Sequence, residues 1–360
     1  MHVLMTSDAV GGVWTYTEEL VSGLIRRGHR VTLVSLGPEP KSDQTTWMTG
    51  LSELDYRLTT YKLEWMQGAA RDIENSTAFL GDLVEEVSPD LLHLNQYCYG
   101  SLRGGVPRII VAHSDVMSWW HSVHGCEPQE SPWMAWYRNV VKDGLRAADT
   151  VIAPSKWMRD KLLENYATDV PTQVIYNGRS PELFAPKVDK EDFVLSVGRL
   201  WDQGKQVDLL AKQEQALNVC IVGNETEPGA ETSCTTVRFC GEQSQEELRR
   251  LFSRAAIYAA TSRYEPFGLA PLEAAFSRCA LVANDIPTFH ELWGDAAYYF
   301  PANDAVGLRS AIRKLADDPG LRKHYSDRAY RRACDNFTAE KMIDSYEHLF
   351  KLIASPVKAI

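Results

Sequence analysis

Two glutamates, Glu265 and Glu273, flank a Pro-Phe-Gly turn that ends at Gly268. The apolar run 256–260 before the turn has the length of a buried strand, and residues 270–276 after it favour a helix. A helix that begins here directs unpaired N–H groups, and the positive end of its dipole, toward a ligand in front of it. An anion such as a diphosphate suits that position. Carboxylates bind phosphate poorly, so we expect the glutamates to accept hydrogen bonds from sugar and ribose hydroxyls on either side.

A second pair of candidate residues, Arg199 and Lys205, follows the apolar run 193–197. The carboxyl ends of strands form the edge at which open α/β sheets bind their ligands. An arginine fork and a lysine ammonium at that edge can together neutralise a leaving nucleoside diphosphate, which removes the need for a metal ion. The alternative is that both are surface cations in a loop.

Two glycines, Gly11 and Gly12, follow the first strand-like run and open a helix that we expect to end just before Gly28. Paired glycines let a ligand approach the backbone closely, and a plain tight turn also uses them. The G-x-G-x-x-G pattern of dinucleotide sites is absent, which disfavours a nicotinamide-dependent dehydrogenase. His113 follows the run 109–112 and is either a catalytic residue or a structural one with satisfied hydrogen bonds.

An aromatic cluster follows His113 along the chain. Indole rings stack on the apolar faces of sugars, so the cluster suits an acceptor platform, while core or helix packing is an equal alternative. Its members are Trp119, Trp120, Trp133, Trp136 and Tyr137.

The elements that must position these residues alternate between short apolar runs and helical stretches, which predicts an α/β fold with parallel sheets. The form of the first residues, a strand followed by glycine, is repeated at 193–198, so we expect two Rossmann-like domains. A turn-rich segment with two prolines, 177–186, is the expected linker between domains 1–178 and 188–338. Residues 339–353 repeat apolar side chains at helical spacing. The expected strands are 31–36, 91–94, 109–112, 151–153, 193–197, 220–222 and 281–283.

Composition limits the class of protein. A chain of 360 residues fits two domains, and 44% hydrophobic residues can fill their cores. A formal net charge of −10 argues against nonspecific binding to nucleic acid. The 7 cysteines include no C-x-x-C pair, so we expect reduced thiols and no zinc site. The chain opens on a strand-like segment and nowhere has 18 consecutive apolar residues, which predicts a soluble, cytoplasmic protein.

The glutamate motif resembles that of the retaining GT-B glycosyltransferases of glycosyltransferase family 4, whose signature is two glutamates with seven residues between them. This resemblance implies that Glu265 lies beside the transferred sugar and that Glu273 binds the ribose of the nucleotide. It also implies that the backbone N–H groups of Phe267, Gly268 and Leu269 contact the donor.

Residues outside the motif extend the resemblance over nearly the whole chain. Gly11 and Gly12 resemble the family's N-terminal glycine loop, which faces the donor diphosphate. Arg199 and Lys205 resemble its phosphate-binding pair, with one more residue between them than is usual. His113 occupies the place of a histidine close to the transferred sugar.

The resemblance implies a GT-B fold, in which two Rossmann-like domains face each other across a cleft and the C-terminal helix, 339–360, packs back on the N-terminal domain. The implied activity is transfer of a hexose-type sugar from a nucleoside diphosphate sugar to an acceptor hydroxyl, with retention of configuration and with neither metal nor cofactor. Expected partners are this donor and a saccharide, lipid-linked or small-molecule acceptor, with peripheral membrane contact allowed and nucleic acid excluded. The alternatives are a GT-B nucleotide-sugar epimerase and a non-catalytic sugar- or nucleotide-binding protein.

Overall fold

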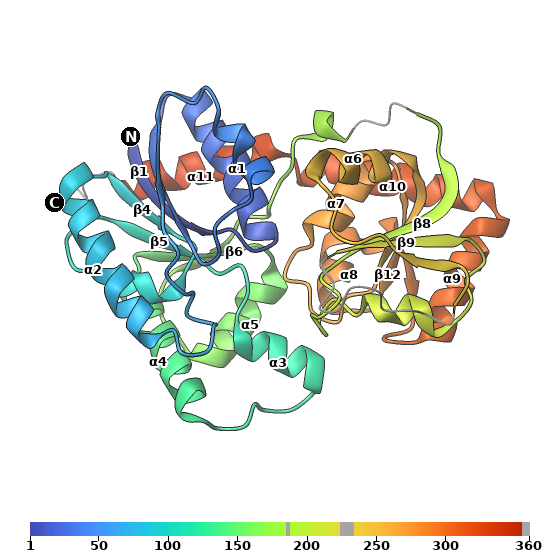
Figure 1. Ribbon diagram of the computed structural model, residues 1–360, viewed down its shortest axis with the longest axis horizontal. Coiled ribbons are helices and arrows are strands. Elements are labelled where there is room, and N and C mark those ends of the chain that lie inside the picture. Colours follow the sequence, from blue (N-terminus) through green and yellow to red (C-terminus); the bar gives the residue numbers. More distant parts are fainter. Residues whose placement is uncertain (185–187, 224–233, 355–360) are drawn as a thin grey trace. The chain divides into compact units, whose positions relative to one another are not determined.

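The computed structural model describes residues 1–184, 188–223 and 234–354 (Figure 1). The chain forms two compact units. The first unit comprises Met1–His121, Cys126–Gly178 and Ala339–Ile360, and the second comprises Ser122–Gly125 and Arg179–Thr338. The linker predicted at 177–186 ends in residues that lie outside the described ranges.

The first unit is built on a parallel sheet in which β1 lies between β2 and β4. Val3 of β1 pairs with Val31 on one side and with Leu91 on the other. The apolar runs of the sequence become strands because a parallel sheet is covered on both faces and exposes few of its side chains to water. In spatial order the strands are β3 (Leu54–Leu58), β2 (Arg30–Leu36), β1 (His2–Asp8), β4 (Leu91–Leu94), β5 (Arg108–Val111), β6 (Thr150–Ala153) and β7 (Thr172–Val174).

Alternate residues along these strands fill two separate cores, because successive side chains point to opposite faces of a sheet. In β1, Val3 and Met5 pack with the helices α1 and α11, whereas Leu4 packs with α2, α4 and α5. The connecting helices are α1 (Gly12–Arg26), α2 (Ala70–Val87), α3 (Val116–His124), α4 (Pro132–Ala147) and α5 (Lys156–Tyr166), with short 3₁₀ helices η1 (Ser42–Met48) and η2 (Tyr97–Ser101).

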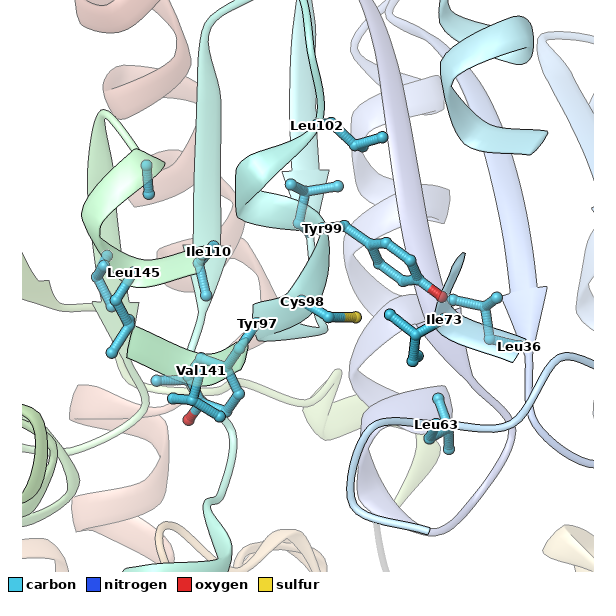
Figure 2. Packing of buried hydrophobic residues seen from close by; sticks show 14 of the residues in the cluster. Leu36, Leu63, Ile73, Tyr97, Cys98, Tyr99, Leu102, Ile110, Val141 and Leu145 are labelled. Carbon is cyan, nitrogen blue, oxygen red and sulfur yellow. The ribbon is translucent and has the colours of Figure 1, made fainter. Parts of the chain in front are cut away.

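The second of these cores is shown in Figure 2, where the side chain of Tyr99 on η2 points toward Ile73 of α2. The buried Tyr99 hydroxyl lies 2.8 Å from Ser76 Oγ, so its polar end has a partner inside the core. This contact fixes η2, which directly follows β4, against the helix layer.

The last helix, α11 (Ala339–Ala354), packs on α1, as the predicted fold requires (Figure 1). A Cβ atom built on Gly23 of α1 would lie 2.2 Å from Ile343 Cδ1, so the missing side chain allows the two helices to approach closely. Arg27, which ends α1, adds ion pairs to Asp344 at 2.6 Å and to Glu347 at 3.0 Å.

The second unit repeats the strand order of the first, with β8 in the place of β1. All neighbouring strands again run parallel, which confirms two Rossmann-like sheets. The strands in spatial order are β10 (Val237–Phe239), β9 (Asn218–Val222), β8 (Glu191–Val197), β11 (Ala255–Ala260), β12 (Ala280–Asn284) and β13 (Tyr298–Phe300). The helices are α6 (Gln245–Arg254), α7 (Leu269–Phe276), α8 (Pro287–Trp293), α9 (Ala305–Asp317) and α10 (Pro319–Asn336), with 3₁₀ helices η3 (Pro181–Leu183), η4 (Val207–Lys212) and η5 (Gly294–Ala296).

The prediction of reduced thiols is wrong for one pair of cysteines. Cys220 lies on β9, and Cys240 directly follows β10, its neighbour in the sheet. The two form a disulfide, with Cα atoms 6.2 Å apart. Sequence spacing could not reveal this pair, because the two cysteines are 20 positions apart and become adjacent only through strand pairing.

Candidate functional site

The predicted donor residues of the second unit follow two central strands, β8 and β11, which are neighbours in the sheet. The chain continues from β8 to β9 on one side, and β11 lies on the other side. Strand order therefore reverses between β8 and β11, and the carboxyl ends at such a reversal are where open α/β sheets bind ligands. The loops 198–206 and 261–268 begin at these two ends.

The first loop folds into successive turns around Asp202. The Asp202 N–H donates to the Arg199 carbonyl at 3.1 Å, and the Lys205 N–H donates to the Asp202 carbonyl at 2.9 Å. The buried Asp202 carboxylate accepts one hydrogen bond from Arg199 Nη2 at 2.7 Å and another from the Gly204 N–H at 2.9 Å. Arg199 also lies over the ring of Trp201, 5.1 Å from its centre. Asp202 thus orients the guanidinium, a role that sequence reasoning missed.

These turns bring Lys205 to Glu265, although the two residues are 60 positions apart. Lys205 Nζ lies 2.9 Å from Glu265 Oε1 and 2.7 Å from Oε2, and Ser262 Oγ donates to Oε2 at 2.8 Å. The Glu265 side chain is about one-tenth exposed, so these charge-assisted hydrogen bonds are shielded from water. The extra residue between Arg199 and Lys205 is accommodated within the turns, and the lysine still reaches the motif.

Backbone hydrogen bonds join the two loops. The Gly204 carbonyl accepts from the Arg263 N–H at 2.8 Å, and Thr261 Oγ1 donates to the Lys205 carbonyl at 2.9 Å. The buried Asn284 at the end of β12 adds a third support, because its Nδ2 donates to the Ser262 carbonyl at 3.1 Å. The loop that carries Glu265 is therefore held from both neighbouring strands, and Asn284 gave no signal in the sequence.

Gly268 forms the turn between Glu265 and helix α7, and its φ of 90° lies in the left-handed region that favours glycine. A Cβ atom at this position would lie 3.0 Å from Glu265 Cγ, so the glycine also leaves room for the glutamate. The Phe267 ring is buried against Phe337, with ring centres 5.5 Å apart. The Phe267 ring therefore faces the core, and contact of the backbone of Phe267, Gly268 and Leu269 with a donor stays a prediction.

Glu273, the second glutamate of the motif, lies inside α7 and contacts an arginine that the sequence analysis did not select. Arg179 Nε is 3.0 Å from Glu273 Oε1, and the two side chains are 3% and 10% exposed. Glu273 thus lies apart from the Lys205–Glu265 pair, with a cationic partner of its own. The motif consequently contains two separate ion pairs, one at each end.

In the first unit, His113 lies just beyond β5 and contacts Asn95, which follows β4. The His113 Nε2 atom is 2.9 Å from Asn95 Oδ1, and Asn95 Nδ2 donates to the Thr6 carbonyl of β1 at 2.7 Å. Burial lowers the pKa of His113 to about 3, so its imidazole is neutral at neutral pH. Hydrogen bonds thereby connect three uncharged groups, the His113 imidazole, the Asn95 amide and the Thr6 carbonyl, across the neighbouring strands β5, β4 and β1.

The two predicted glycines of the first unit form the turn between β1 and α1. Gly11 has φ 71°, a left-handed conformation, and precedes the first helical residue, Gly12. Both residues are exposed, and Asp8 Oδ1 accepts the Val10 N–H at 2.9 Å to close the turn before them. Gly28 after α1 has φ 82°, as expected for a residue that follows a helix.

Core packing explains most of the aromatic cluster. Trp133, Trp136 and Tyr137 of α4 pack on the core that contains β4 and β5, and Tyr137 is almost wholly buried. Trp119 and Trp120 of α3 contact each other edge to face, with ring centres 6.3 Å apart. The platform interpretation therefore has no support from the α4 residues.

Metal binding and membrane insertion each require a recognisable structural feature. Within residues 1–184, 188–223 and 234–354, no three His, Cys, Asp or Glu side chains gather as a metal ion would require. In the same ranges, none of the helices combines the length and apolar character needed to cross a bilayer.

Comparisons with known proteins agree with this geometry. The chain matches the family model Glycosyltransferase Family 4 over residues 10–183 and the model Glycosyl transferases group 1 over residues 182–332. A curated relative, the O-antigen chain mannosyltransferase RfbU of Salmonella typhimurium, is 27% identical over 214 residues, which are 56% of this chain and 60% of that protein.

Solved structures share the fold at low identity. Sucrose-phosphate synthase from Thermosynechococcus elongatus superposes with a TM-score of 0.78 at 18% identity, over 98% of both chains. HepE of Anabaena, solved with UDP and glucose, gives a TM-score of 0.73 at 17% identity, over 98% of this chain and 100% of that one. Because two successive family models match the chain and its paired parallel sheets match these structures, it belongs to the GT-B glycosyltransferases of the family 4 type.

Proposed function

We propose that this glycosyltransferase moves a sugar from a nucleoside diphosphate sugar to an acceptor hydroxyl, with retention of configuration and without a metal ion. The observation that carries the proposal is the Lys205–Glu265 pair, which lies at the carboxyl ends of β8 and β11, directly before the amino end of α7. The UDP and glucose held by HepE, a structure of the same fold, support a nucleotide sugar as the donor. Neither an epimerase nor a silent binding protein is favoured by the family match.

The diphosphate of the donor is assigned to the turn at Gly268, where the first N–H groups of α7 and its dipole favour an anion. Negative charge on this group grows as the bond to the sugar breaks. Arg199 and Lys205 approach the same edge of the sheet, and two fixed cations there stabilise that charge more in the transition state than in the ground state. This pair supplies the neutralisation that a metal ion gives in other transferases.

Glu265 is assigned to the transferred sugar. Its carboxylate accepts hydrogen bonds from Lys205 and Ser262, which hold it in place and reduce its strength as a nucleophile. We therefore give it an electrostatic role, in which it opposes positive charge on the sugar and accepts hydrogen bonds from sugar hydroxyls. The acceptor attacks the face from which the diphosphate leaves, and a diphosphate oxygen takes the acceptor proton. No covalent sugar–enzyme intermediate is required.

The roles of Gly11, Gly12 and His113 remain predictions from the family resemblance. A neutral imidazole suits hydrogen bonding to a sugar hydroxyl better than charge stabilisation. Replacing His113 with alanine is expected to lower kcat about tenfold or more, a typical loss for one positioned polar group.

Product analysis tests the proposal. Donors are first selected from UDP, GDP and ADP sugars by thermal shift, and the product formed with a saccharide acceptor is examined by proton NMR. Retention predicts that an α-linked donor gives an α-linked product, at a rate that EDTA leaves unchanged. A β-linked product would contradict retention, loss of turnover in EDTA with recovery in Mg²⁺ or Mn²⁺ would contradict metal independence, and isomerised donor without acceptor would indicate an epimerase.

A further inference from the structure

Arg179 is the first residue of the long segment of the second unit, Arg179–Thr338, and its side chain is only 3% exposed. A buried arginine is rare unless a partner compensates its charge, and here the partner is Glu273 of the glutamate motif. We propose that Arg179 is a positioning residue, which orients the Glu273 carboxylate so that it binds the ribose hydroxyls of the nucleotide. This inference rests on the proposed function, because it presumes a nucleoside diphosphate at α7.

The surroundings of Arg179 fix its guanidinium from several directions. Its backbone N–H donates to the Phe337 carbonyl at 3.1 Å, and Arg179 forms a parallel bridge with Thr338. Its guanidinium carbon lies 5.2 Å from the centre of the Phe184 ring. Because both the backbone and the side chain are held, the Nε atom provides a rigid reference for Glu273.

These contacts connect the motif to two of the places where the chain passes between its units. Arg179 lies just after the passage at Gly178 and contacts Glu273, while Phe337 lies just before the passage at Thr338 and packs on Phe267. These two passages are joined by the hydrogen bond between Arg179 and Phe337. The turn at Phe267 and the helix that carries Glu273 are therefore both held by the hydrogen-bonded pair of Arg179 and Phe337.

Glu273 needs such a partner for its proposed task. An ionised carboxylate only accepts hydrogen bonds, which suits a pair of ribose hydroxyls. Its place on α7, between the fully buried Leu272 and Ala274, would leave an unpaired carboxylate desolvated and free to adopt other rotamers. Arg179 keeps the group charged and directs it, whereas a purely structural ion pair would stabilise α7 without affecting the choice of ligand.

Ribose selectivity distinguishes these roles. Calorimetry with UDP, GDP and ADP identifies the diphosphate that the wild-type protein binds, and the same measurement with its 2′-deoxy counterpart gives the preference for ribose. We expect Arg179→Met to reduce this preference on the order of tenfold, toward equal binding, because it disturbs hydrogen bonds to a charged group. Arg179→Lys should restore part of the preference, since an ammonium keeps the charge without the planar fork.

Matched variants separate the possible outcomes. Arg254→Met removes an exposed arginine of the same unit from its ion pair with a glutamate. This change should leave the preference for ribose unchanged. In a Glu273→Gln background, Arg179→Met should have little further effect on the preference, because the two residues act together. This double variant also leaves no unpaired buried charge, so it serves as the test if Arg179→Met alone does not fold.

Two results would overturn the inference, and they differ in what they say of the proposed function. A wild-type protein that binds none of the three diphosphates would remove the proposed function together with the inference. A wild-type protein that prefers ribose, with a folded Arg179→Met variant that binds the selected diphosphate and its 2′-deoxy counterpart equally more weakly, would leave the proposed function intact and reduce Arg179 to a structural role.

Discussion

The two units share one strand order but differ in the chemistry at the carboxyl ends of their central strands. In the second unit these ends carry charged pairs, Lys205 with Glu265 and Arg199 with Asp202. In the first unit the ends of β4 and β5 carry uncharged groups, Asn95 and His113, while the end of β1 carries the carboxylate of Asp8. A repeated fold therefore does not repeat a site, because the side chains at the strand ends, not the sheet, decide what can bind.

We propose that this difference gives the two sheets distinct tasks. Paired charges that are partly shielded from water suit a leaving diphosphate and a positively charged sugar, whereas neutral hydrogen-bonding groups suit hydroxyls. Four predictions, from the largest expected effect to the smallest, test the charged side chains of the second unit, the conformation of its turn and the buried neutral His93 of the first unit.

Removing the charge of Glu265 should break the second unit's chemistry most severely. We expect Glu265→Gln to lower kcat on the order of 10²-fold or more, because the variant no longer opposes positive charge on the sugar. Its affinity for a free nucleoside diphosphate should stay the same or rise, since Lys205 loses its carboxylate partner. Glu273→Gln is the matched comparison, and calorimetry should show weaker binding of the nucleotide. Equal loss of nucleotide affinity in both variants would contradict the assigned roles.

Arg199 tests the cationic side of the same site. Arg199→Ala should lower kcat on the order of 10²-fold, as loss of a preorganised partner of a developing anion does. Arg254→Ala, which removes an exposed arginine in an ion pair with Glu191, provides the control and should be near wild type. Steady-state kinetics with a saturating acceptor decides the matter, and an unchanged kcat in folded Arg199→Ala would exclude the residue from catalysis.

Alanine substitutions at two glycines compare the turn before α7, which contains Gly268, with the interior of helix α2, which contains Gly81. Gly268→Ala should destabilise the second unit by about 1–2 kcal/mol, because alanine is strained at a φ of 90° and its Cβ would press on Glu265. Gly81→Ala in α2 should instead stabilise the first unit by roughly 1 kcal/mol, since open space surrounds that helical position. Urea unfolding of both variants should give opposite signs, and like signs would count against the conformational argument.

Acid should weaken the contribution of the buried, neutral His93 to the stability of the first unit. Burial lowers the pKa of His93 to about 3, below its ordinary value of 6.5, so the unfolded chain binds a proton that the folded unit does not. The contribution of His93 is therefore complete above pH 6.5 and declines as the pH falls toward 3, by at most about 1.4 kcal/mol per pH unit. The groups that face it are Tyr16, His113 and Tyr346.

Unfolding in urea at pH 7 and pH 5.5 measures this loss. His93→Gln should reduce the difference between the two pH values, while the exposed His290 can be replaced by glutamine without changing it. An identical pH difference in wild type and His93→Gln would show that this histidine is not the acid-sensitive group.

Long apolar runs made much of the fold predictable. The runs at 91–94 and 193–197 became β4 and β8, because a central parallel strand is buried on both faces and leaves an uninterrupted apolar signal. The outer strands β3 and β7 escaped prediction, since their side chains are largely part-exposed and mix polar with apolar types. An edge strand forms because it pairs with the strand beside it, and this pairing leaves no pattern in the sequence of the edge strand.

By itself the sequence determined the short segment that holds Glu265, Gly268 and Glu273, because its turn and helix are local properties. Tertiary structure alone decided their partners. Lys205 reaches Glu265 across 60 residues, and Arg179 reaches Glu273 across a chain crossing. The physical reason is that local conformation depends on neighbours in sequence, whereas the pairing of buried charges depends on which strand ends and crossings the complete fold brings together.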